Sequence, residues 1–323
     1  MKIKLHRESG SKYFNIYVGL TVLIISLIIS SLYTGGDQIG YKNAYSLIEG
    51  LGIREAFPIY DHNVSSPEYM HFLITYIGVN AGISKDILMS VLNGLLAACS
   101  FKIFKLWGVD YRVSCLIIFS NFYFLVLYFA AERLKIGFIF LTFSLLHVKK
   151  PFKSYALAIF SIWSHFSLLF IYSAAWIHEF YGNSSLKTPP GERKKLLMFL
   201  LIIPPLVFVF YESKMLFWKL GTYVQQNANF SLMGIMPIVI IILMSGVYAR
   251  DLLKSFFVFA PITIFIIIMG GSRLNMLAYF IFLSFALRVN GGINLGVLIS
   301  SLYMLYKSIG FMSNVLDHGH GFT

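Results

Sequence analysis

The chain has 323 residues, of which 58% are hydrophobic and only 12% are charged, whereas about a quarter of the residues of a soluble domain are charged. Such a chain cannot cover itself with polar surface in water, and its apolar residues fall in runs long enough to cross a bilayer. The net charge of +12 comes from short basic clusters between these runs. That distribution is typical of membrane proteins and excludes a nucleic-acid-binding surface.

Because the apolar runs lack the alternation of barrel strands, the sequence predicts an all-α, polytopic transmembrane helical bundle. Residues 1–323 are expected to form a single integral membrane domain. The first span is predicted over residues 14–33, and the basic residues before it place the N-terminus in the cytoplasm. Residues 34–67, rich in Gly, Pro, Asp and aromatic residues, are expected to form an extracytoplasmic loop.

Two apolar segments follow, at residues 69–83 and 87–107. The basic residues on either side require an odd number of crossings between residues 68 and 107. The shorter segment, 69–83, is therefore predicted to be a re-entrant or tilted piece beside the outer loop.

The remaining elements alternate across the membrane. Residues 155–180 carry basic residues on both sides, which predicts two short helices that meet near His165 and bring it to the outer side. Residues 212–231 are predicted to form a second extracytoplasmic loop. Together with spans at 113–130, 134–147, 196–211, 232–249, 255–269, 274–288 and 293–310, the pattern predicts about ten or eleven membrane segments, including re-entrant or broken helices.

Two arginines stand at the predicted outer ends of helices. Arg133 lies in the polar break AERLK, and Arg273 follows two glycines and Ser272. Charges at a helix centre in the membrane cost about 2.5–3.5 kcal/mol, so an arginine between apolar runs calls for a reason. A guanidinium is always ionised, and its planar fork of donors can hold a pyrophosphate without a metal. The alternative is that both are interfacial anchors, with Arg133 paired to Glu132.

Two further residues are candidates for proton transfer or sugar binding. His165 lies in an apolar run and could accept a proton from a sugar hydroxyl, although a buried structural histidine is commoner. Asp37 could orient a hydroxyl, although an aspartate after two glycines is also an ordinary cap or turn residue. Cys99 and Cys115 fall inside predicted helices, so neither a disulfide framework nor a metal site is expected.

Five segments in a fixed order carry a family resemblance. They are GGDQIGYKNAY, PEYMHFLITYIG, ERLKIGFIFLTFSLLHVKKPF, the helix with SHFSLL, and GSRLNMLAYF. This order resembles the EpsG-like and Wzy-like family of bacterial polysaccharide polymerases over most of the chain. Where family members show Arg-Gln or a similar pair followed by Gly or Ala, this chain has Arg133 followed by Leu134 and Lys135.

The resemblance implies an inverting glycosyltransferase with a GT-C-like fold at the periplasmic face of the bacterial inner membrane. It would join oligosaccharide repeat units carried on undecaprenyl pyrophosphate, as in O-antigen biosynthesis, and would need no cofactor and no metal. Besides this lipid-linked substrate and the bilayer, a chain-length regulator and a flippase are expected partners. The expected catalytic residues are Arg133, Arg273, His165 and Asp37, and the expected substrate-binding residues are Tyr41, Glu68, Glu132 and Ser272.

Two other functions remain open from the residues. A flippase or transporter of lipid-linked oligosaccharides would also present cations to a pyrophosphate, but is expected to show inverted repeats and charges at mid-membrane. A membrane acyltransferase that modifies polysaccharide is expected to place His and Arg on the cytoplasmic side.

Overall fold

The computed structural model describes residues 13–65, 68–182, 221, 232–269 and 272–322. These residues are all-helical, with no strand among them. They divide into two compact units, one made of Met1–His165 with Gly291–Thr323 and the other of Phe166–Asn290. The predicted all-α class is therefore confirmed for the described part of the chain.

Three described helices are long and apolar enough to cross a membrane: α1 (Phe14–Leu32), α5 (Lys85–Leu106) and α16 (Leu295–His318) with the short η2 (Asn290–Gly292) before it. The exposed sides of α1 and α16 are largely hydrophobic, as expected of helices that face lipid. These helices indicate a membrane protein. The predicted total of about ten or eleven segments stays a prediction.

The span predicted over residues 113–130 is broken into two helices, α6 (Tyr111–Ser120) and α7 (Phe122–Phe129), which are bent by 53°. Asn121 between them has an extended backbone (ψ 125°), and its side chain accepts a hydrogen bond of 3.0 Å from the backbone N–H of Tyr123. An asparagine that caps a new helix in this way ends the preceding one.

Helices α1 and α5 pack closely because two glycines face each other where they cross. A Cβ on Gly94 would lie 2.7 Å from the carbonyl oxygen of Gly19, and a Cβ on Gly19 would lie 2.8 Å from that of Gly94. Small residues allow this approach of backbones in membrane helices.

We expect Gly94→Ala to lower the free energy of unfolding by about 1–3 kcal/mol, because the added methyl group must push two backbones apart. Thermal unfolding in detergent measures the change. Gly310→Ala in α16 is the matched control, since a Cβ there meets no atom within 4 Å and should be neutral or stabilising. An unchanged melting temperature for Gly94→Ala would contradict the close crossing.

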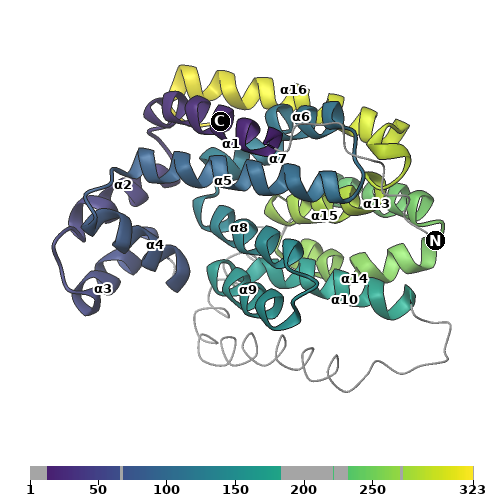
Figure 1. Ribbon diagram of the computed structural model, residues 1–323, viewed down its shortest axis with the longest axis horizontal. Coiled ribbons are helices and arrows are strands. Elements are labelled where there is room, and N and C mark those ends of the chain that lie inside the picture. The colour runs from purple at the N-terminus through teal and green to yellow at the C-terminus, as the bar shows by residue number, and fades with distance from the viewer. Residues whose placement is uncertain (1–12, 66–67, 183–220, 222–231, 270–271, 323) are drawn as a thin grey trace. The chain divides into compact units, whose positions relative to one another are not determined.

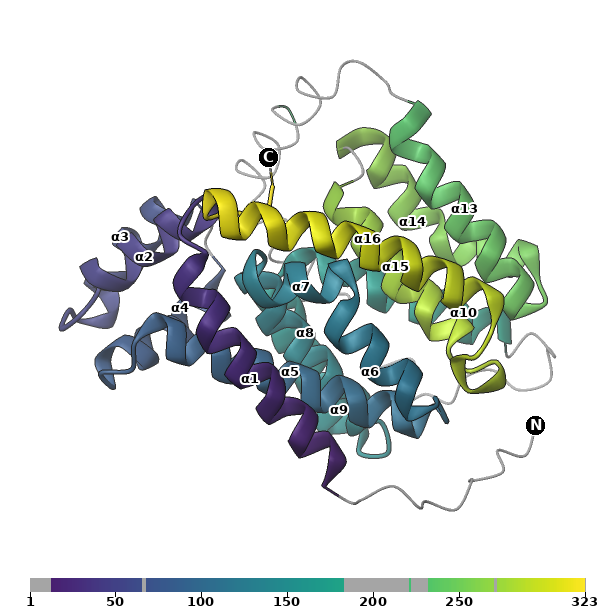
Figure 2. The ribbon, with the colours of Figure 1, turned by 90° about the horizontal axis from the view of Figure 1, so that it is seen from above.

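Three short helices form a lobe: α2 (Asp37–Leu47), α3 (Ile53–Val64) and α4 (Tyr69–Asn80). Figure 1 shows the lobe at one end of α5, and Figure 2 shows α1 crossing in front of α5. Its core consists of Ala44, Ile48, Ala56, Tyr60, Phe72 and Val79. The lobe thus contains the predicted outer loop and the predicted 69–83 segment, and α5 is the one candidate crossing between residues 68 and 107.

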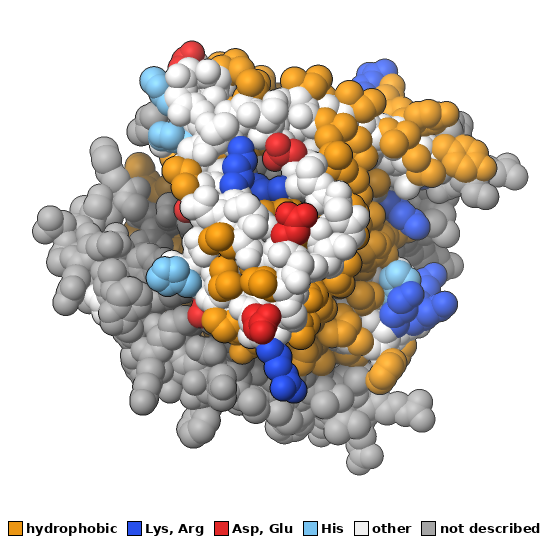
Figure 3. Space-filling model, turned by 90° about the vertical axis from the view of Figure 1, so that its left-hand side faces the viewer, with side chains coloured by type: hydrophobic (Ala, Val, Ile, Leu, Met, Phe, Trp, Pro, Cys, Tyr) orange, Lys and Arg blue, Asp and Glu red, His pale blue; other side chains and the backbone are white. Residues whose placement is uncertain are grey.

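Acidic and basic side chains lie on the front of this lobe, whereas a band of hydrophobic side chains runs beside it (Figure 3). The exposed residues of α1 and α5 include Ile24, Ile28, Ile87 and Val91. The lobe also exposes apolar side chains, among them Leu73 and Ile77 of α4, so the charged side chains mark one face of the lobe and not its whole surface.

Helices α8 (Glu132–Leu146) and α9 (Pro151–Ser164) form a hairpin. Pro151 stands in the first turn of α9, where its missing N–H costs nothing, and the Ser161 hydroxyl donates to the Gly137 carbonyl at 2.8 Å. Because the two helices have 15 and 14 residues, they are nearly equal in length. The start of α8 and the end of α9 therefore lie at the same end of the hairpin.

The predicted helix break near His165 is present. Helix α9 ends at Ser164, His165 has an extended backbone, and η1 (Phe166–Leu168) and α10 (Leu169–Gly182) follow. The second unit also contains α13 (Leu232–Ala249), α14 (Leu252–Met269) and α15 (Ser272–Ala286), and α14 packs against α10 and α13. The predicted span 196–211 lies outside the described residues, as does the predicted loop 212–231 apart from residue 221.

Candidate functional site

Three charged or ionisable side chains meet at the open end of the α8–α9 hairpin. The Glu68 carboxylate lies between Arg133 and His165, with Oε2 3.2 Å from Arg133 Nε and Oε1 2.9 Å from His165 Nδ1. The side chains are only 11–19% exposed. Both contacts have the distance of an ion pair without the alignment of a hydrogen bond. The site therefore holds a carboxylate that can pair with one permanent cation and with a second when His165 is protonated.

The ends of helices position these three residues. Glu68 precedes the first residue of α4, Arg133 is in the first turn of α8, and His165 follows the last residue of α9. Side chains at helix ends escape the packing of the helix body and can converge from different directions. The hairpin brings Arg133 and His165 together, and the lobe supplies Glu68.

The ionised form of Glu68 is strongly favoured over its protonated form. Burial by itself raises the pKa of this carboxyl, but the neighbouring His165 and Arg133 outweigh it and lower the pKa to about 2. Glu68 is therefore an anion throughout the neutral range and compensates the charge of Arg133.

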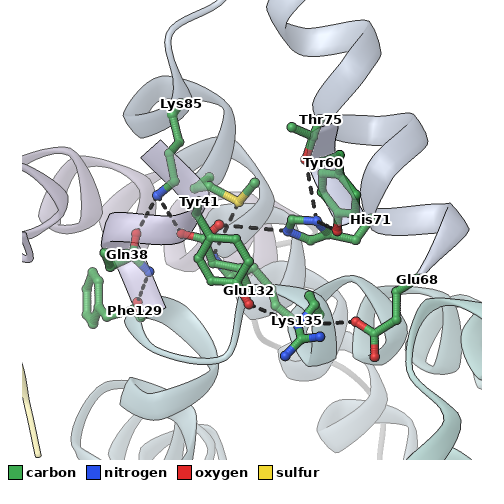
Figure 4. Close-up of polar contacts among 12 residues, drawn as sticks. Gln38, Tyr41, Tyr60, Glu68, His71, Thr75, Lys85, Phe129, Glu132 and Lys135 are labelled. Atoms are coloured by element: carbon green, nitrogen blue, oxygen red, sulfur yellow. Dashed lines mark hydrogen bonds and ion pairs between the residues drawn. The ribbon is translucent and has the colours of Figure 1, made fainter. Parts of the chain in front are cut away.

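A second polar cluster lies beside the first and is more deeply buried. Lys85 Nζ donates to Glu132 Oε1 at 2.7 Å and to the side-chain oxygen of Gln38, and Gln38 Nε2 donates to the Phe129 carbonyl at 3.0 Å. His71 Nε2 lies 3.8 Å from Glu132 Oε2. Figure 4 shows Lys85 reaching between Gln38 and Glu132.

Tyr60 completes this second cluster through His71. The Tyr60 hydroxyl and His71 Nδ1 are 2.6 Å apart. If the hydroxyl donates, Nδ1 is the acceptor and the proton of the neutral ring sits on Nε2, which faces Glu132. The N–H of His71 then points toward Glu132 Oε2 across 3.8 Å, a distance longer than a hydrogen bond.

Tyr41 links the two clusters. Arg133 Nε donates to the Tyr41 hydroxyl at 3.0 Å, and Lys85 Nζ lies 5.8 Å from the centre of the Tyr41 ring. Tyr41 is buried, and this burial raises the pKa of its hydroxyl, so Tyr41 accepts the hydrogen bond from Arg133 as a neutral phenol.

Some of the site residues expected from the sequence lie together in the structure, and others lie apart from them. Arg133, His165, Glu68 and Tyr41 lie together. Glu132, expected to bind substrate or to pair with Arg133, pairs instead with Lys85 and is 2% exposed.

Asp37 is exposed in the first turn of α2, where Gly36 rather than Asp37 is the N-cap residue. Its neighbour Gln38 is the one that enters the cluster. Arg273 and Ser272 are the first residues of α15 in the second unit, and their side chains lie outside the described ones.

Lys85, Lys135, His71 and Gln38 were missed by sequence reasoning. Lys85 and Lys135 each adjoin an apolar run, which is the same signal that singled out Arg133. Lys135 is fully buried, and its Nζ lies 3.9 Å from Met89 Sδ. His71 and Gln38 carried no sequence signal, because their role depends on how the lobe folds.

The two clusters balance Lys85 and Arg133 against Glu132 and Glu68, and a protonated His165 adds a further positive charge. Such an arrangement can accept an anionic group and move one proton through a histidine.

No protein-family model, no curated protein and no solved structure matches the chain. The resemblance to polysaccharide polymerases therefore stays a prediction.

Proposed function

We propose that the protein is a polysaccharide polymerase that joins oligosaccharide repeat units carried on a lipid pyrophosphate. The observation that carries the proposal is the Glu68 carboxylate held between Arg133 and His165. The arrangement supplies the two things this transfer needs, a cation for the leaving group and a base for the acceptor hydroxyl.

Arg133 is the proposed pyrophosphate ligand. Both of its contacts with other described residues use Nε, to Glu68 and to Tyr41. The single Nε–H donates to Tyr41 and faces Glu68, and the two terminal amino groups are left for a bidentate contact with phosphate oxygens. Charge that develops on the departing pyrophosphate would be stabilised there.

His165 is the proposed base. The acceptor hydroxyl oxygen forms a bond to the anomeric carbon of the donor sugar, and the bond from that carbon to the pyrophosphate oxygen breaks with its electron pair. The hydroxyl proton passes to His165 Nε2. Because Glu68 lies 2.9 Å from Nδ1 of the same ring, it stabilises the imidazolium that forms.

The location of the residues supports an extracytoplasmic reaction. On the predicted topology residues 34–67 are outside and the 69–83 segment lies beside them, which puts Glu68, at the start of α4, at the outer face. We therefore place the reaction at the periplasmic face of the bacterial inner membrane, where lipid-linked repeat units would be polymerised, and expect a flippase and a chain-length regulator as partners. That Arg273 binds the pyrophosphate stays a prediction from the sequence.

The proposal predicts the effect of removing the base. We expect His165→Gln to lower the rate of elongation by about 10²-fold, because glutamine can contact Glu68 but cannot take up a proton. Elongation is measured as the growth of a purified lipid-linked repeat unit. His62→Gln, at an exposed histidine of α3, should retain the full rate, and a full rate for His165→Gln would eliminate His165 as the base.

A cellular experiment separates the proposed function from its rivals. In a strain that lacks the gene, surface glycan should stop at one repeat unit, since export continues while growth of the chain does not. Loss of all surface glycan would favour the flippase or transporter, and an unchanged length distribution would favour the acyltransferase.

A further inference from the structure

We infer that Lys85 and Glu132 are positioning residues for the reaction, and that their buried ion pair holds α2 against α8 so that Arg133 keeps its orientation. The inference rests on the proposed function and extends it to residues that the proposed chemistry does not use.

Two parallel links join α2 to α8. Helix α2 contributes Gln38 and Tyr41, which are three residues apart and therefore share one face of the helix. Helix α8 contributes the neighbours Glu132 and Arg133 in its first turn. One link is the direct contact of Arg133 Nε with the Tyr41 hydroxyl, at 3.0 Å. The other passes through Lys85, which donates to both Gln38 and Glu132 (Figure 4).

The side chains of the two links differ in how far they are exposed, and this difference gives the links different roles. Arg133 retains some exposure, with 15% of its side chain accessible, so a ligand can reach it. The side chains of Lys85 and Glu132 are 8% and 3% exposed. Side chains that are so deeply buried do not contact a large substrate. They can, however, hold in place a neighbouring residue that does.

The ion pair also connects Arg133 to the rest of the lobe. Glu132 lies 3.8 Å from His71 of α4, and His71 contacts Tyr60 of α3 at 2.6 Å. Helices α2, α3 and α4 are therefore all joined, directly or through one residue, to the first turn of α8. Loss of Lys85 and Glu132 would leave the contacts of Arg133 with Tyr41 and Glu68 as the side-chain links between the lobe and the first turn of α8 among the described residues.

The test removes both charges at once. A buried charge that loses its partner destabilises a protein strongly, whereas an apolar pair of similar volume restores stability. We expect Lys85→Met and Glu132→Leu each to lower the melting temperature, and the double variant to recover it. The double variant should nevertheless have a kcat for elongation about tenfold lower with little change in KM, because misplacing a catalytic group affects the reaction step.

The control is another buried polar contact of α5 away from the site. Asn93 Nδ2 donates to the Ser26 hydroxyl of α1 at 3.0 Å, and both residues are fully buried. The double variant Asn93→Leu/Ser26→Ala should keep the wild-type kcat. A wild-type kcat in the Lys85→Met/Glu132→Leu variant, or an equal loss in the control, would overturn the inference.

A measurement without substrate keeps this inference distinct from the proposed function. Amide hydrogen exchange of the segment Asp37–Leu47 should become about tenfold faster in the Lys85→Met/Glu132→Leu variant, while exchange in α9 should not change. Unchanged exchange in α2 would refute the positioning role whether or not the protein elongates glycan. Absence of elongation by the wild-type protein would instead refute the proposed function.

Discussion

Arg133→Lys should lower the rate of elongation by about 10²–10³-fold, although the charge is kept. The guanidinium contacts Glu68 and Tyr41 through Nε and presents its other two nitrogens in the same plane. A lysine ammonium has no such plane and cannot keep both contacts while it also binds two phosphate oxygens. The rate is measured with purified protein and a lipid-linked repeat unit.

Arg112→Lys is the matched control for this substitution. Arg112 also donates from Nε to a tyrosine hydroxyl, that of Tyr111 at 3.1 Å, but it is exposed at the start of α6. The rate should stay at the wild-type value. If Arg133→Lys were equally active, Arg133 would be an interfacial anchor and not a pyrophosphate ligand.

Glu68→Gln should have the largest combined effect. The change removes the partner of both Arg133 and His165, and breaking such a buried pair costs about 3–5 kcal/mol of stability. We also expect elongation to fall by about 10²–10³-fold, since the imidazolium formed on His165 loses its carboxylate. Glu55→Gln, at an exposed glutamate of α3, should leave both stability and rate unchanged.

The pH dependence of unfolding gives an independent check of Glu68. Its pKa in the folded protein is about 2, whereas that of an unperturbed glutamate is about 4.3. A lowered pKa contributes stability that is fully present above the unfolded value and is lost as the pH falls toward the folded value. Between about pH 4.5 and pH 2, the wild-type protein should lose the stability advantage that it has over Glu68→Gln. A constant difference across this range would contradict the ion pairs of Glu68.

Hydropathy and the positions of charges were sufficient for the all-helical class and for several helix boundaries. Helices α1 and α13 fall within a residue of the predicted boundaries, and the break at His165 was predicted because basic residues flank both ends of the segment. The bend at Asn121 was missed, because a single capping asparagine interrupts an otherwise continuous apolar run. Average hydropathy over a span cannot register such a residue.

The candidate site was only partly predictable for a similar reason. Arg133 could be singled out as an isolated charge beside apolar residues, and Lys85 and Lys135 satisfied the same criterion. The spacing of the charged residues along the sequence does not show which carboxylate pairs with which cation. Glu132 is the neighbour of Arg133 in sequence, yet consecutive residues of a helix point in different directions, so Glu132 pairs with Lys85 and Arg133 with the distant Glu68.

The most direct test of the proposed function is elongation by the purified full-length protein in lipid nanodiscs. A lipid-pyrophosphate-linked repeat unit is supplied without nucleotide or any other enzyme, and the products are separated by length. The proposed function predicts glycans of two and more repeat units together with release of the free lipid pyrophosphate, both formed about 10²–10³-fold more slowly by Arg133→Lys. A repeat unit that remains unchanged in length with the wild-type protein would contradict it.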